Sequence, residues 1–209
     1  MTRRRAAIFI SGRGTNMESL LAAMADPAYP VEPALILSNN PGAAGLAYAA
    51  DKGVATVAID HRPFKGNRPA FEAAIQAALE AAEIDLICLA GFMRILTGGF
   101  VDQWHNRMVN IHPSLLPSFK GLNTHERALN AGVAFHGCTV HLVRAEMDDG
   151  PILGQASLII QPDETPSDLA ARVLKLEHQL YPAALAAYAS GDLQLSGEII
   201  VPVPLSICE

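Results

Sequence analysis

The apolar positions in the first half of the chain form short continuous runs, separated by longer stretches with helical spacing. The runs predict strands at residues 6–10, 34–37, 54–59, 84–90 and 108–111. Between them, one helix is predicted to begin at Thr15, and others cover residues 43–52, 68–83 and 100–104. Strands that are apolar on both faces are typical of a parallel sheet with helices on both sides. This order predicts an α/β fold with a doubly wound, mostly parallel, Rossmann-like sheet.

The pattern changes after residue 111. A helix is predicted at residues 125–131, and strands at 137–143 and 152–160 flank an acidic turn, which suggests an antiparallel pair added to the parallel sheet. Thr165 and Pro166 open a long helix that we expect to end near Ser190. Short strands at 193–195 and 199–203 would complete the sheet edge or pair with another subunit. Because no linker or repeat interrupts the chain, residues 1–209 are predicted to form a single domain.

Composition narrows the class of protein. Hydrophobic residues make up 50% of the 209 residues and charged residues 17%, which is the reverse of a disordered chain. The net charge of −6 lacks the basic field of a non-specific nucleic-acid binder. No apolar stretch reaches the roughly 20 residues of a spanning helix. The three cysteines are far apart and form neither a disulfide framework nor a metal motif, which favours a reducing cytoplasm.

The turn after the first predicted strand is rich in glycine. It runs from Ser11 to Asn16, and Thr15 and Glu18 have the Thr-x-x-Glu spacing of a capping box. The free N–H groups of a helix start attract anions, and ligands of such sheets bind beyond the carboxyl ends of the strands. The turn lacks the third glycine of the dinucleotide fingerprint. Thr15 and Asn16 instead offer side-chain donors that suit a single phosphate. Alternatively, the segment is only a tight turn that needs glycine.

The end of the fifth predicted strand carries an amide and an imidazole. Asn110 and His112 lie two residues apart, so they share one side of an extended chain. The amide could stabilise an oxyanion and the imidazole could donate a proton, a combination that suits acyl transfer. Alternatively, His112 only bonds locally at the strand end. A carboxylate from the acidic turn at residues 146–150 would favour the protonated ring, although such a turn is more often a solvated hairpin.

Other polar residues are assigned to structure. His136 and His141 do not match the spacing of a metalloprotease helix or a zinc finger, so no metal site is indicated. Ser11 and Ser114 lack the Gly-x-Ser-x-Gly elbow of a serine hydrolase.

Taken together, these segments resemble the formyltransferases that use 10-formyltetrahydrofolate. The resemblance covers nearly the whole chain in order, and its most specific part is the motif Asn-x-His-Pro-Ser-Leu-Leu-Pro followed by a later Asp. The first and last segments point to the branch of the family that formylates glycinamide ribonucleotide in purine biosynthesis. The segments that carry it are residues 10–16, 89–96, 110–117, 136–141, 148–150 and 176–182.

The resemblance implies roles for individual residues. Asn110, His112 and Asp148 would be catalytic: His112 as proton donor, Asp148 as its partner and proton relay, and Asn110 as ligand of the formyl oxygen. Formyl transfer would be direct, through a tetrahedral intermediate, with 10-formyltetrahydrofolate as co-substrate and no metal. The implied ribonucleotide site comprises Gly14, Thr15, Asn16 and Glu177. The implied folate site comprises Arg68, Met93, Arg94, Ile95, Leu96 and Asn110.

Three departures from the family pattern qualify these roles. A lysine near the phosphate in some relatives is replaced by Leu174, with Lys175 one position later, so a contact from Lys175 is left open. Asn123 stands where relatives often have a histidine. Asp149 stands where glycine or alanine is usual, which leaves two adjacent carboxylates; the spacing from Gly150 favours Asp148.

Three other functions are weighed against this sequence. Methionyl-tRNA formyltransferase carries a further C-terminal β-barrel domain and a basic surface for tRNA, for which 209 residues and a net charge of −6 are expected to leave no room. Formyltetrahydrofolate deformylase carries an extra N-terminal domain, whereas this fold is expected to start at about residue 6. A catalytically silent nucleotide- or folate-binding module is the alternative from a different class. The expected partners are the two small-molecule substrates, not nucleic acid or membrane, and both a monomer and a homodimer are compatible with the sequence.

Overall fold

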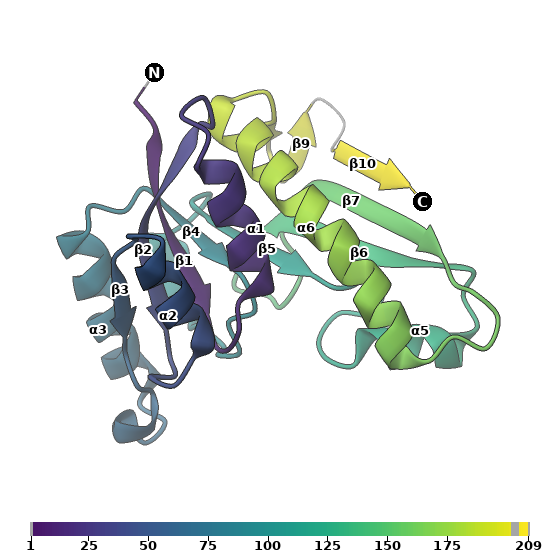
Figure 1. Cartoon of the computed structure of the whole chain (residues 1–209), viewed down its shortest axis with the longest axis horizontal. Helices are drawn as coiled ribbons and strands as arrows, with labels where there is room; N and C mark the ends of the chain where they lie inside the picture. The colour runs from purple at the N-terminus through teal and green to yellow at the C-terminus, as the bar shows by residue number, and fades with distance from the viewer. Residues whose placement is uncertain (1, 202–204, 209) are drawn as a thin grey trace. The chain divides into compact units, whose positions relative to one another are not determined.

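The structure is a computed structural model that describes residues 2–201 and 205–208. The chain divides into two compact units, Met1–Val109 and Asn110–Glu209. Figure 1 traces the elements of both in chain order.

The first unit is built around four parallel strands in the order β4-β1-β2-β3. Residues 6–10 of β1 are fully buried, because neighbouring strands flank β1 on both edges and helices cover its faces. The apolar runs are therefore confirmed as strands. Their bounds are β1 (Arg4–Ile10), β2 (Val31–Ser38), β3 (Thr56–Ala58) and β4 (Leu86–Leu89).

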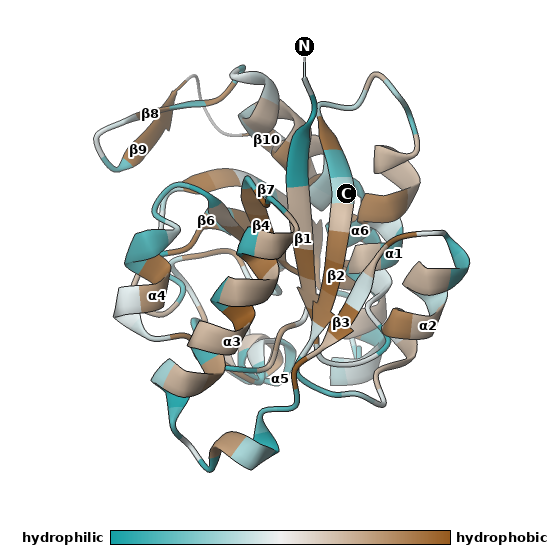
Figure 2. Ribbon diagram, turned by 90° about the vertical axis from the view of Figure 1, so that its left-hand side faces the viewer, coloured by the Kyte–Doolittle hydropathy of each residue, from teal (hydrophilic) through white to brown (hydrophobic). Residues whose placement is uncertain are grey.

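Helices lie on both sides of these strands. Figure 2 shows α1 and α2 on one side of β1 and β2, and α3 and α4 on the other. This confirms the doubly wound arrangement. The helices are α1 (Thr15–Met24), α2 (Ala44–Asp51), α3 (Arg68–Ala81) and α4 (Gly98–Gln103), with a short 3₁₀ helix, η1 (Arg62–Phe64), that the sequence pattern did not predict.

The second unit carries an antiparallel pair of strands under a long helix. Strand β5 (Met108–His112) leads into this unit, where β6 (Phe135–Leu142) and β7 (Ile152–Ile159) pair antiparallel, as predicted. Helix α6 (Pro166–Ser190) packs on β6 and β7 and also contacts α5 (Thr124–Ala131) (Figure 1). Thr165 caps α6 with a reciprocal bond to Asp168, and Pro166 is the first helical residue, as predicted.

Two sequence predictions need correction. The last strands do not complete the sheet edge: β8 (Gln194–Ser196) and β9 (Ile199–Val201) pair with each other, and β10 (Leu205–Cys208) lies parallel to β7 instead. Gly197 makes their tight turn possible with a φ of 65°. Residues 202–203 of the predicted strand lie outside the described residues.

The predicted capping box at α1 is also wrong. The cap is Gly14, which has a left-handed backbone with φ 76° and makes no side-chain cap bond. Thr15 is already the first helical residue, so its hydroxyl cannot take the capping position. Glu18 instead approaches the Arg13 guanidinium at 3.9 Å.

Among the helices that the structure describes, none is long and apolar enough to cross a membrane.

Candidate active site

The second unit gathers polar side chains at the end of β5. Asn110 and His112 are two residues apart on this strand, and His112 is only 6% exposed. Its Nε2 atom lies 3.1 Å from the carbonyl oxygen of Phe119, and its Nδ1 atom lies 3.5 Å from Oδ2 of Asp148. Both partners are acceptors, so a ring with a proton on each nitrogen satisfies both.

The two adjacent carboxylates have different surroundings. Asp148 has a side chain that is 12% exposed and accepts a hydrogen bond of 2.8 Å from the backbone N–H of Gly121. It has a positive φ of 52°, a conformation more common for aspartate than for most side chains. Asp149 is 53% exposed and pairs with Lys120. Asp148 is thus the carboxylate that the structure places beside His112.

His141, which sequence analysis assigned to structure, belongs to this cluster. Its Nδ1 atom lies 2.9 Å from the Leu142 carbonyl, its Nε2 atom lies 3.2 Å from the Asn110 amide nitrogen, and Asp148 is 4.0 Å away. Burial lowers the pKa of His141, against smaller raising effects from Leu142 and Asp148. A carbonyl can only accept, so the neutral ring carries its proton on Nδ1 and accepts the amide N–H at Nε2.

This arrangement orients the Asn110 amide. With Nδ2 bound to His141, one amide N–H is used and the other is left for a further acceptor. His141 was not predicted to belong to the site, because its spacing from His136 matches no metal-binding motif. The signal that could have found it is the one that marked His112: a polar ring at the end of a buried strand.

The segment that follows His112 is held by a buried hydroxyl. Thr139 Oγ1 donates to the Ser114 carbonyl at 2.7 Å and accepts from the backbone N–H of Leu116 at 3.0 Å. Gln155 Nε2 donates both to Thr139 Oγ1 at 3.0 Å and to the Leu116 carbonyl at 2.9 Å. These bonds tie residues 114–116 to β6 and β7, and so help fix the turn that brings the Phe119 carbonyl to His112.

Two further histidines stand near the cluster. His125 Nδ1 lies 3.1 Å from His136 Nε2. Burial lowers the pKa of His136 to about 4, and the nearby His125 and His112 add to the shift. Burial also lowers the pKa of His125, with His112 as the second cause. Positive charge on these two rings is therefore disfavoured by the fold.

The residues predicted to bind the ribonucleotide fall in both units. In the first unit, Gly14, Thr15 and Asn16 form the start of α1, as the sequence pattern predicted. In the second unit, Glu177 lies on α6 and is only 7% exposed. Burial first, and the Glu177 charge second, raise the pKa of the nearby Cys138 thiol well above its usual range.

The residues predicted to bind folate, apart from Asn110, lie in the first unit. Met93, Arg94, Ile95 and Leu96 lie in the loop between β4 and α4, where Met93 is 69% exposed and Ile95 is 60% exposed. Arg68 is exposed at the first position of α3. The backbone N–H of Met93 donates to Ser11 Oγ at 2.7 Å.

Within residues 2–201 and 205–208, no group of three or more histidine, cysteine, aspartate or glutamate side chains is placed to hold a metal ion.

Comparisons with known proteins agree on one family. The formyl transferase family profile matches residues 4–185. The trifunctional purine biosynthetic protein adenosine-3 of Homo sapiens is 46% identical over 191 residues, which cover 91% of this chain and 19% of that protein. The chain thus spans about a fifth of the length of this relative.

Two relatives named phosphoribosylglycinamide formyltransferase match over nearly their whole length. The phosphoribosylglycinamide formyltransferase of Haemophilus influenzae is 36% identical over 196 residues, which cover 94% of this chain and 92% of that protein. The crystal structure of phosphoribosylglycinamide formyltransferase from Anaplasma phagocytophilum superposes with a TM-score of 0.90 at 38% identity and covers 100% of both chains. On these matches, the chain belongs to the formyl transferase family.

Proposed function

We propose that this protein transfers the formyl group of 10-formyltetrahydrofolate to the amine of glycinamide ribonucleotide, as a phosphoribosylglycinamide formyltransferase of purine biosynthesis. The observation that carries the proposal is the cluster in the second unit: His112 meets Asp148 at 3.5 Å, and His141 orients the Asn110 amide at 3.2 Å. The full-length similarity to a relative that bears this name supports the choice of substrates.

The reaction needs one carbon transfer and one net proton transfer. The substrate amine attacks the formyl carbon, a new C–N bond forms, and the formyl oxygen becomes an oxyanion. The intermediate collapses when the bond between the formyl carbon and the folate nitrogen breaks. The products are the N-formyl ribonucleotide and tetrahydrofolate, whose nitrogen gains the proton that the amine has lost.

The cluster supplies a group for each of these events. The free N–H of the Asn110 amide binds the oxyanion, as an oxyanion hole does in acyl transfer. Protonated His112 donates its proton to the leaving folate nitrogen. Asp148 accepts the proton from the attacking amine and returns it to His112, which restores the starting state. Direct transfer between two bound substrates gains from their mutual orientation and requires no covalent enzyme intermediate.

The substrate sites extend this proposal. The start of α1, with Gly14, Thr15 and Asn16, binds the ribonucleotide phosphate through backbone N–H groups, and Glu177 contributes to binding of the ribonucleotide. The loop with Met93, Arg94, Ile95 and Leu96, together with Arg68 and Asn110, binds the folate. We also propose that residues 1–209 function as one formyltransferase domain, since the family profile runs through both units.

A cytoplasmic location completes the proposal. Its support is that Cys88, Cys138 and Cys208 form no disulfide with one another, since disulfides are rare in a reducing compartment.

One assay tests the proposed reaction. The protein is mixed with glycinamide ribonucleotide and 10-formyltetrahydrofolate, and the release of tetrahydrofolate is followed together with the N-formyl product. We expect release that depends on both substrates. Release without the ribonucleotide would mean a hydrolase instead. Saturable binding of either substrate without release would mean a silent binding module.

A further inference from the structure

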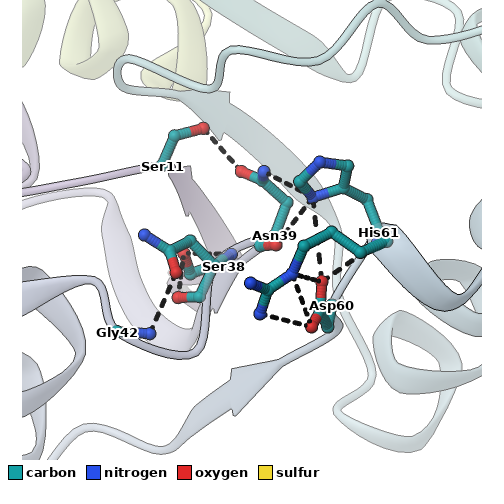
Figure 3. A network of polar contacts seen from close by, with 8 residues as sticks. Ser11, Ser38, Asn39, Gly42, Asp60 and His61 are labelled. Carbon is teal, nitrogen blue, oxygen red and sulfur yellow. Dashed lines mark hydrogen bonds and ion pairs between the residues drawn. The ribbon is translucent and has the colours of Figure 1, made fainter.

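A chain of polar contacts in the first unit links the ends of three strands. Figure 3 shows it at close range: Ser11 follows β1, Asn39 follows β2, and His61 lies beyond β3. Ser11 Oγ lies 2.5 Å from Asn39 Oδ1. Asn39 Nδ2 lies 3.2 Å from His61 Nδ1, which is also 3.1 Å from the Asn39 backbone oxygen.

The chain continues to the loop between β4 and α4. Ser11 has one hydroxyl proton, and it donates this proton to Asn39 Oδ1. Its oxygen therefore remains an acceptor and takes the backbone N–H of Met93 at 2.7 Å. The order of donors is thus Met93 to Ser11 and Ser11 to Asn39. At the far end, His61 Nδ1 lies within hydrogen-bond distance of both Asn39 Nδ2 and the Asn39 backbone oxygen, and so holds Asn39 in place. Asn39 is only 5% exposed, so it has little freedom to exchange these partners for water.

Met93 is the middle anchor of its loop. At one end, the Ala90 N–H donates to the Phe9 carbonyl at 2.9 Å. At the other end, the Thr97 N–H donates to Glu72 at 2.6 Å. Between these two bonds, the backbone N–H of Met93 is held by Ser11. The Met93 side chain itself is mostly exposed.

Fixing this N–H also fixes a carbonyl. The peptide group is planar and trans, so the N–H of Met93 and the C=O of Phe92 point in opposite directions. The Phe92 ring is itself placed by an edge contact with Phe9, at 5.2 Å between centroids. Ser11 therefore sets the direction of the peptide unit between Phe92 and Met93. Asn39 in turn sets the direction of the Ser11 hydroxyl.

We propose that Asn39 and His61 are positioning residues for folate binding, acting through Ser11 on the peptide unit between Phe92 and Met93. The inference rests on the proposed function, in which this loop binds 10-formyltetrahydrofolate. Neither residue touches the folate. Each holds the next hydroxyl or amide in one orientation, so that the loop backbone is already in place when the co-substrate arrives, which lowers the cost of binding.

The first test follows the Met93 amide itself. Hydrogen exchange of this N–H is measured in the native chain and in Ser11→Ala, His61→Ala and Ser38→Ala. Ser38 is the matched control, because its hydroxyl belongs to the neighbouring turn, where it bonds to the backbone of Asn40 and not to Ser11 or Met93. We expect exchange to be about 10-fold faster in Ser11→Ala and several-fold faster in His61→Ala, in line with the loss or weakening of one hydrogen bond.

The second test separates the two substrates. In the transfer assay, we expect Ser11→Ala and His61→Ala to raise the KM for 10-formyltetrahydrofolate by about 2- to 10-fold, while the KM for the ribonucleotide and kcat stay within about twofold. The double variant should be no worse than Ser11→Ala alone, because both changes break the same chain.

The outcomes are distinct. Three outcomes would each overturn the proposed action of His61 and Asn39 through Ser11. They are unchanged exchange of the Met93 N–H in His61→Ala, equal effects in Ser38→Ala, and a KM in the double variant that combines the full effects of both single changes. A native chain that fails the transfer assay would refute the proposed function, and the exchange data would still decide whether His61 and Asn39 act through Ser11.

Discussion

The carboxylate of Asp148 lies 3.5 Å from Nδ1 of His112, and both side chains are nearly buried, at 12% and 7% exposure. On its other ring nitrogen, His112 faces the Phe119 carbonyl. In such surroundings, a carboxylate interacts with a neighbouring imidazolium more strongly than it would in water. The adjacent Asp149 pairs with Lys120 at the surface. The two neighbouring aspartates therefore have different surroundings.

Replacement of each aspartate tests this difference. Asp148→Asn should lower kcat by about 10²–10⁴-fold, because His112 loses its charged partner and the amine loses its proton acceptor. Asp149→Asn is the matched control and should lower kcat by less than about fivefold, since exposed ion pairs contribute little. Both are measured by tetrahydrofolate release at saturating substrates. Similar losses in the two variants would contradict the assignment of Asp148.

The amide and the imidazole on β5 give a second prediction. Asn110→Ala removes the proposed oxyanion donor, and His112→Ala removes the proposed proton donor. Each should lower turnover by at least about 10²-fold while circular dichroism and thermal unfolding show a folded chain. Near-normal turnover in either variant would refute its role.

Much of the fold and part of the candidate site could be predicted from local sequence patterns. The strands could be predicted because their apolar runs are short and continuous, and Asn110 and His112 could be paired because they lie two residues apart on one strand. The choice of Asp148 came from a family resemblance, since nothing local ties the acidic turn to His112. That proximity exists only because β6 carries the chain back to the turn where Asp148 lies.

Other features depend on contacts that no local pattern encodes. His141 lies on β6 and Asn110 on the neighbouring strand β5, so their contact depends on how these two strands pair and cannot be predicted from the sequence pattern of either strand. Strand β10 is four residues long, and its place beside β7 is set by tertiary pairing. At α1, the Thr-x-x-Glu spacing is present, but the left-handed Gly14 takes the cap position one residue earlier. In each case, tertiary or backbone geometry outweighs the sequence signal.

The buried hydroxyl of Thr139 gives a third prediction, about stability. Thr139→Val keeps the shape but leaves the Ser114 carbonyl and the Leu116 N–H without their partner. An unsatisfied buried group costs about 1–3 kcal/mol, so we expect the free energy of unfolding to fall by about 2–4 kcal/mol. Thr139→Ser keeps the hydroxyl and should cost only about 1 kcal/mol for the lost methyl group. Urea denaturation measures both, and equal losses would argue against the hydrogen-bond explanation.

The lowered pKa of His136 predicts how stability depends on pH. In the folded chain this pKa is about 4, against 6.5 for an unperturbed histidine. Between these values the unfolded chain binds more protons, so the free energy of unfolding falls as pH decreases from 6.5 towards 4. Above pH 6.5 the ring is neutral in both states and contributes no slope.

The variant His136→Gln isolates this contribution, because glutamine does not titrate. Urea denaturation is repeated from pH 4.5 to 7.5 for both proteins. The native chain should lose more stability than the variant over the acidic half of this range, and the two slopes should agree above pH 7. Parallel curves throughout would contradict the lowered pKa.

A close approach between α2 and the glycine-rich turn gives the last prediction. A Cβ atom at Gly45 would lie 2.5 Å from Ile10 Cδ1 and 2.7 Å from the Arg13 backbone oxygen. Only glycine lets the first turn of α2 contact this turn, where the Gly45 N–H also donates to the Gly12 carbonyl at 3.2 Å. Alanine favours a helix over glycine by about 1 kcal/mol, so any loss of function in Gly45→Ala comes from this displacement and not from the helix.

We therefore expect Gly45→Ala to displace the turn that is proposed to bind the phosphate. The KM for glycinamide ribonucleotide should rise by about 10-fold or more, since small misplacements of binding groups are costly, while the KM for 10-formyltetrahydrofolate changes little. Gly42→Ala is the matched control, because its Cβ would meet only an ordinary contact of 3.5 Å with Asn40. An unchanged ribonucleotide KM in Gly45→Ala would mean that the turn at Gly12 and Arg13 does not position the phosphate, and the start of α1 would lose its place in the proposed site.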